Sequence, residues 1–178
     1  MKKLVMASIG GGLILFFWGF VSWTVLSWHK DTSLSFNNEA AMGQSIVQNA
    51  PQAGIYFLPF NEEDFVDGGP SVFAAVAPQY HLDMGFTLGV GLLGYIVSAF
   101  LVCLALNMCR GLNYAQRLKF ILLLGLIIGL VGHFPYWNWM NFSTPYTLVM
   151  IVDSVLAWLL AGLLIAKLVG VQEPDSGT

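Results

Sequence analysis

The sequence predicts an all-α membrane protein: a four-transmembrane-helix bundle with a small extracytoplasmic α+β cap between helices 1 and 2. Hydrophobic residues make up 57% of the 178-residue chain and charged residues only 10%, which lies outside the range of soluble globular domains. Four apolar runs each approach the roughly 20 helical residues that cross a hydrocarbon core. Polar and acidic residues gather between the first two runs, and they predict the cap.

The chain divides into four spans and the segments that connect them. The first span is predicted to be an uncleaved anchor, because its apolar stretch is about twice as long as that of a signal peptide. The predicted segments are, in order, transmembrane helix 1 at 1–28, an outer loop domain at 29–83, transmembrane helix 2 at 84–109, a cytoplasmic loop at 110–117, transmembrane helix 3 at 118–134, an outer aromatic loop at 135–144, transmembrane helix 4 at 145–168 and a cytoplasmic tail at 169–178.

The cations predict the orientation of the spans. Lysine and arginine near the ends of membrane helices are retained on the cytoplasmic side. With four passes, only Lys30 falls on the side of the cap, and six cations fall on the other side: Lys2, Lys3, Arg110, Arg117, Lys119 and Lys167. We therefore expect a multi-pass protein of the cytoplasmic (inner) membrane with both termini in the cytoplasm.

The segment between the first two spans predicts a short helix and a hairpin. Asn38 is a good N-cap for a helix that continues to Gln48. The ranges 54–59 and 72–77 are rich in β-branched and aromatic residues and flank a turn-rich stretch, as expected for two strands. Since two strands are only marginally stable in water, the cap should rest on the outer helix ends. The expected contacts are Phe57, Phe60 and Phe73.

Small residues four positions apart predict where helices approach each other. Water does not drive helices together in lipid, so close backbone approach at glycine matters. These seams serve either packing within the bundle or a partner helix. They are predicted at Gly85 and Gly89, at Gly125 and Gly129, and at Gly162 with Ala166.

Asp153 is the most informative single residue for function. It follows the start of the last span by eight positions, roughly 12 Å along the helix, where a carboxylate is costly unless it is protonated, paired or wetted. One interpretation is structural, with Ser, Tyr or Trp donors on a neighbouring helix. The other is a ligand or proton site beneath a pocket whose floor is formed by Tyr136, Trp137 and Trp139. No basic residue is expected at the same depth, so an ion pair within the chain is not predicted.

Three histidines are predicted to share the outer interface. His29 follows the first span, His81 precedes the second, and His133 ends the third, with Met84 close by. Imidazole and thioether groups suit copper, zinc or haem iron, so these four residues are candidate metal ligands. Interfacial preference alone would place histidines at the same level, because the ring has an apolar body and a polar tip. No H-x-x-x-H spacing favours the metal interpretation.

The functional prediction is a non-enzymatic accessory or interaction subunit of a membrane complex. Nucleotide, protease and hydrolase motifs are missing from the sequence. A net charge of −3 without a basic cluster excludes nucleic acid as a partner. The expected partners are membrane lipids and other membrane subunits or a second copy, and no cofactor is expected. Two alternatives stay open: a small transporter or ligand-binding protein that uses Asp153, and a haem- or copper-binding protein that uses the histidines.

Overall fold

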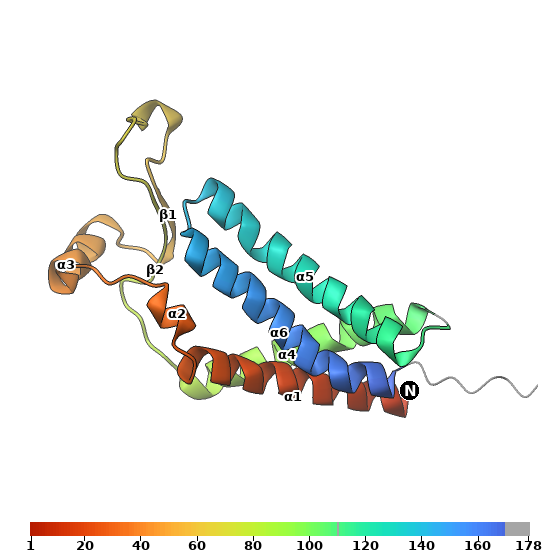
Figure 1. Ribbon diagram of the computed structural model, residues 1–178. Helices are drawn as coiled ribbons and strands as arrows, with labels where there is room; N and C mark the ends of the chain where they lie inside the picture. The colour runs from red at the N-terminus through yellow and green to blue at the C-terminus, as the bar shows by residue number, and fades with distance from the viewer. Residues whose placement is uncertain (110, 170–178) are drawn as a thin grey trace, which may run out of the picture.

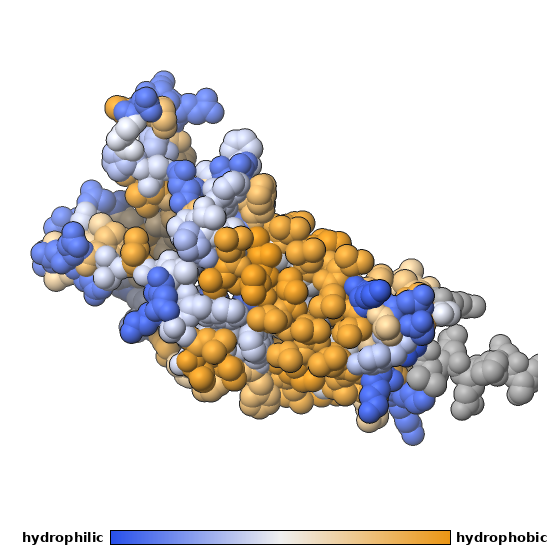
Figure 2. Space-filling view, viewed as in Figure 1, coloured by the Kyte–Doolittle hydropathy of each residue, from blue (hydrophilic) through white to orange (hydrophobic). Residues whose placement is uncertain are grey.

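Four long helices dominate the computed structural model, which describes residues 1–109 and 111–169. They are α1 (Lys2–Thr24), α4 (Met84–Met108), α5 (Tyr114–Trp139) and α6 (Thr144–Leu168). All four are long and apolar enough to cross a membrane. Figure 2 shows a broad apolar surface over them with hydrophilic residues toward both ends. The four predicted spans are confirmed as apolar helices; Arg110 and residues 170–178 of the tail predicted at 169–178 lie outside the described residues.

Polar caps determine where most of the helices begin. Asp83 before α4 and Ser143 before α6 each accept a hydrogen bond from the backbone N–H three residues ahead. Asn113 and Gln116 form a reciprocal capping box at the start of α5. These bonds satisfy N–H groups that have no partner within the helix. The start of each of these helices is therefore determined locally by the sequence.

The third span is longer than predicted, because α5 continues through Pro135 to Trp139. The prediction ends this span at residue 134, where the apolar run stops, and the proline that follows removes one backbone donor. The helix is instead closed beyond the proline by a hydrogen bond from the Met140 N–H to the Tyr136 carbonyl. Pro135 is thus part of α5, and the predicted outer loop is reduced to a few residues before Thr144.

The first span is shorter than predicted. The helix α1 ends at Thr24, and the N–H groups of Val25 and Leu26 both bond to the Val21 carbonyl. After this break the chain forms a separate short turn, α2 (Trp28–Asp31). The turn lies against α6 rather than extending α1 (Figure 1).

The four long helices form an open arrangement rather than a closed bundle. The helix α6 packs against both α1 and α5, whereas α4 packs on α1 and makes few contacts with α5 (Figure 1). The buried residues of α4 all lie between Ala99 and Leu106, in its second half. The first half of α4 therefore diverges from its neighbours, and this divergence leaves room beside α1 and α6.

Glycines allow the closest helix contacts. A Cβ added at Gly12 of α1 would lie 2.6 Å from the Ile96 Cα of α4, so only hydrogen fits there. Gly125 and Gly129 of α5 and Gly162 of α6 lie in the interface between those two helices, as expected for small residues at a helix seam. In α4, no atom of another helix comes within 4 Å of the Cβ position at Gly85 or Gly89, so these two glycines do not serve packing within the chain, and the alternative of a partner helix stays a prediction.

A small cap lies at one end of the long helices, opposite the N-terminus (Figure 1). It consists of α3 (Glu39–Asn49), β1 (Gly54–Leu58), the 3-10 turn η1 (Glu62–Asp64) and β2 (Val72–Val76). The strands pair antiparallel, with Phe57 opposite Phe73. Asn38 caps α3 by accepting from the Ala41 N–H. The predicted capped helix and two-stranded hairpin are confirmed.

One phenylalanine of the cap contacts the long helices. The Phe73 ring lies 5.8 Å from the Tyr136 ring and 6.2 Å from the Phe142 ring, between the centroids. The Asn141 amide adds a hydrogen bond of 3.2 Å to the Ser71 hydroxyl. The prediction that Phe60 makes such a contact is wrong. Phe60 is 82% exposed, because it follows β1 in the connection that projects away from the helices.

Candidate functional site

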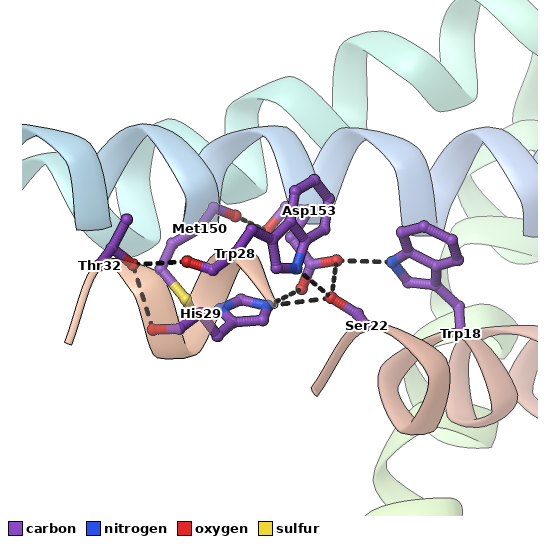
Figure 3. A network of polar contacts seen from close by, with 8 residues as sticks. Trp18, Ser22, Trp28, His29, Thr32, Met150 and Asp153 are labelled. Carbon is purple, nitrogen blue, oxygen red and sulfur yellow. Dashed lines mark hydrogen bonds and ion pairs between the residues drawn. The ribbon is translucent and has the colours of Figure 1, made fainter. Parts of the chain in front are cut away.

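The carboxylate of Asp153 on α6 is held by two donors from α1 (Figure 3). The Trp18 Nε1–H donates to Oδ1 over 2.6 Å, and the Ser22 hydroxyl donates to the same oxygen over 2.8 Å. Trp18 and Ser22 are four residues apart, so they share one face of α1. Tryptophan and serine are among the donors that the structural interpretation of Asp153 predicts. They tie α1 to α6 within the apolar part of the molecule.

A histidine completes this network, although the sequence predicts no cationic partner at that depth. His29 Nε2 lies 3.5 Å from Asp153 Oδ2 and 2.9 Å from the Ser22 hydroxyl oxygen. The His29 residue is only 3% exposed, so it is not at an interface with water. The reason is the break after Thr24, because the short turn α2 folds back and lays His29 against α6. The burial of His29 against α6 was not predicted from the sequence.

The hydrogen bonds assign the proton on His29. Because Ser22 donates its single proton to Asp153, its oxygen must accept from both Trp28 Nε1, at 3.0 Å, and His29 Nε2. The proton of Nε2 then points toward both Ser22 and Asp153. The other nitrogen, Nδ1, is buried and has no hydrogen-bond partner among the described residues. The network thus places a proton on Nε2 of His29.

The composition Ser, His and Asp resembles a catalytic triad, but the geometry differs. In a triad the acid binds Nδ1, and Nε2 accepts the proton of the serine. In this network both the acid and the serine lie at Nε2, and the serine hydroxyl donates to the acid. Ser22 is therefore not activated as a nucleophile. The arrangement positions a carboxylate instead.

Two tryptophan rings contact the imidazole of His29. The Trp23 ring stacks on the His29 ring, with centroids 3.9 Å apart and planes inclined by 3°. The Trp28 ring meets His29 edge-on at 5.6 Å. The two rings hold the imidazole in place, whereas the Asp153 side chain stays 14% exposed beside the cavity.

A cavity of about 520 Å³ opens beside Asp153 between all four long helices. Its walls include Trp18 and Trp23 of α1 and Tyr95 of α4. Ile128 of α5 and Trp158 of α6 also contribute. Among the described residues that line the cavity, Asp153 is the only charged one. The cavity exists because the first half of α4 diverges from α5 and α6.

The outer aromatic residues do not line this cavity. Trp137 donates to the Thr144 hydroxyl over 3.0 Å, and the Tyr136 ring packs on Phe142 with centroids 5.3 Å apart. Trp139, at the end of α5, is 76% exposed. All three residues lie at the end of α5 near the cap. None of the three is among the described residues that line the cavity beside Asp153.

The candidate metal ligands lie in different environments. His81 and Met84 are exposed at the start of α4, whereas His29 is buried against α6. His133 on α5 is half-buried. Within residues 1–109 and 111–169, no group of three or more His, Cys, Asp or Glu side chains is arranged to hold a metal ion. Among the described candidate ligands, His29 has a carboxylate close by, since Asp153 Oδ2 lies 3.5 Å from its Nε2.

The fold and the site together define a class: a multi-pass membrane protein with four candidate spans and a buried acid–histidine pair beside an intramembrane cavity. In comparisons with known proteins, no family model, curated protein or solved structure matches the chain. The function therefore has to be argued from the site.

Proposed function

We propose that this membrane protein binds an amphiphilic ligand that carries a protonated amine, with Asp153 as its counter-ion inside the cavity. The observation that carries the proposal is the position of one carboxylate in the wall of a cavity within the spans whose other described lining residues are uncharged and mostly apolar or aromatic. A carboxylate at this depth is costly and marks a functional site by default. A cationic ligand would offset that cost.

The carboxylate has one oxygen left for a ligand. Oδ1 accepts both strong hydrogen bonds, from Trp18 and Ser22, whereas Oδ2 has only the 3.5 Å contact with His29 among the described residues. Two more tryptophans and a tyrosine line the cavity besides Trp18, and aromatic rings of this kind favour a cation that lies over the ring face: Trp23, Trp158 and Tyr95. A volume of about 520 Å³ lies within the range of small-molecule sites.

The shape of the site supports a ligand with an apolar tail. Leu101 and Val102 of α4 and Ile128 of α5 line the cavity away from Asp153. Since α4 and α5 make few contacts with each other, the gap between them offers a route from the lipid phase. A molecule that partitions into the bilayer could enter by this route with its amine directed to Oδ2.

Replacing Asp153 with asparagine should abolish the preference for amines. The asparagine side chain would keep an oxygen for Trp18 and Ser22, so the fold should persist, but the charge would be lost. Removing one partner of a buried charge pair costs about 2–5 kcal/mol, which corresponds to roughly 30-fold weaker binding or more. The measurement is calorimetric titration of dodecylamine, compared with dodecanol, into the purified chain in micelles.

Two matched variants control this experiment. Asp31→Asn removes an equal charge from an exposed position outside the cavity and should leave binding unchanged. Ser98→Phe should weaken dodecylamine and dodecanol alike, because Ser98 lines the cavity and bonds only to its own helix. Equal affinity of the Asp153→Asn variant and the unmodified chain for dodecylamine would contradict the proposal.

We also infer that the cap lies outside the cytoplasm and that both termini lie inside it. The argument is the six-to-one distribution of cations between the two ends. With Cys109 changed to serine, an impermeant maleimide added to intact cells should label Asp67→Cys in the cap and leave Ala115→Cys unlabelled. The opposite pattern would invert the orientation.

A role as an interaction subunit is the second candidate. It is favoured by the start of α4, where Gly85 and Gly89 lie four residues apart on one face and have no atom of another helix within 4 Å of their Cβ positions. Small residues on an unpartnered helix face allow another helix to approach closely. If neither dodecylamine nor dodecanol bound to the unmodified chain, this second role would be favoured over ligand binding.

A further inference from the structure

We propose that a second site, at the opposite end of the spans, binds the phosphate group of an anionic lipid. A groove of about 680 Å³ lies between the start of α1 and the ends of α4 and α6. Lys2 and Lys3 line it together with the amide side chain of Asn107. This site shares no lining residue with the Asp153 cavity, so the inference is independent of the proposed function.

The charges at the groove fit an anion. Lys2 and Lys3 are both exposed, and neither ammonium group has an ion-pair partner among the described residues. No aspartate or glutamate is among the described residues that line the groove. Two adjacent ammonium groups and an amide donor offer several hydrogen bonds to phosphate oxygens.

The remaining walls select a lipid over a soluble phosphate. Leu4 and Val5 of α1 and Phe100 and Leu104 of α4 line the groove below the lysines. Leu104 and Phe100 are each 38% exposed, so they offer an apolar surface for an acyl chain. The groove lies where three helices begin or end, at the level that a lipid head group occupies. The lysine heads and the apolar walls thus match the two parts of one amphiphile.

The test measures lipid selectivity of the full chain by native mass spectrometry. Purified protein is equilibrated with equimolar phosphatidylglycerol and phosphatidylcholine, and the bound lipids are counted. Each lysine near a membrane surface is worth a factor of about five in binding of an anionic lipid, so K2Q and K3Q together should weaken phosphatidylglycerol roughly 25-fold. Phosphatidylcholine binding should change little.

Three further measurements distinguish a defined lipid site from general attraction of anions to this end of the molecule. Lys167→Gln removes a cation near the same end but outside the groove, and it should weaken phosphatidylglycerol less than twofold. Leu104→Trp keeps the charge but fills the groove, and it should reduce phosphatidylglycerol occupancy. Inorganic phosphate should not displace the lipid. A loss with Lys167→Gln equal to that with K2Q and K3Q, full occupancy with Leu104→Trp, or displacement by phosphate would each overturn the proposal.

Discussion

Replacing Asp153 with leucine should lower the free energy of unfolding by about 3 kcal/mol, one of the two largest effects expected for a single residue. Leucine has no acceptor, so Trp18 Nε1 and the Ser22 hydroxyl lose their hydrogen bonds at 2.6 and 2.8 Å, and the buried His29 loses its partner. A buried donor that is left without an acceptor costs about 1–3 kcal/mol in soluble proteins. Hydrogen bonds between membrane helices average only about 0.6 kcal/mol. Because Trp18, Ser22 and His29 all contact the same carboxylate, we expect its loss to cost more than this average for one hydrogen bond.

The measurement is reversible unfolding in mixed micelles, followed by tryptophan fluorescence. Asp153→Asn serves as the matched control, because it retains an oxygen for Trp18 and Ser22 and should lose less than half as much stability. The double variant with His29→Leu tests the pair itself. If the two single effects simply add, then His29 and Asp153 do not interact. If Asp153→Leu unfolds like the unmodified chain, the carboxylate contributes no net stability to the fold. Its role would then be ligand binding alone.

Replacing Gly12 with alanine should separate α1 from α4 and lower stability by about 1–3 kcal/mol, the range typical of overpacked cores. The new Cβ would lie 2.6 Å from the Ile96 Cα and 2.8 Å from its backbone nitrogen. Backbone atoms cannot rotate away as a side chain can, so the helices must move apart. This cost should exceed the gain of up to about 1 kcal/mol that alanine offers over glycine within a helix.

Two glycines provide the comparison. Gly132→Ala on α5 adds the same methyl group where no neighbour lies within 4 Å, so its effect should be neutral or slightly stabilising. Gly10→Ala should fall between the two, because the atom it meets at 2.6 Å is the flexible end of the Leu164 side chain. The measurement is again unfolding in mixed micelles. Equal stabilities for Gly12→Ala and Gly132→Ala would contradict the close contact between α1 and α4.

Much of the fold could be predicted because its causes are local. A span needs only enough consecutive apolar residues, and a helix start needs only a capping side chain at the right position. The 25 residues of α4 and the cap at Asn38 could therefore be predicted to the residue or nearly so. Pro135 shows the limit of such rules. Its missing donor predicts a helix end, yet the hydrogen bond from Met140 to Tyr136 closes α5 beyond it.

The candidate site could be predicted only in part. Asp153 is identified by its depth in the last span, and serine and tryptophan donors are expected for it. Which donors reach it could not be predicted, because Trp18 and Ser22 lie 135 and 131 positions away in the chain. Their spacing of four on α1 is a usable signal, since it places two polar groups on one helix face. His29 gives no such signal, because its position depends on the chain reversal after Thr24.

The sequence by itself determined that this protein has four apolar helices, a polar cap with a capped helix and a hairpin, and one acid within the spans. These properties depend on composition and on contacts between near neighbours. Only the tertiary structure decided that α2 brings His29 to Asp153, that the start of α4 diverges from α5, and that a cavity opens between them. The physical reason is that these features depend on how helices far apart in the sequence fit together. Lipid gives no hydrophobic force to set that fit, so glycine contacts and a few buried polar groups determine it.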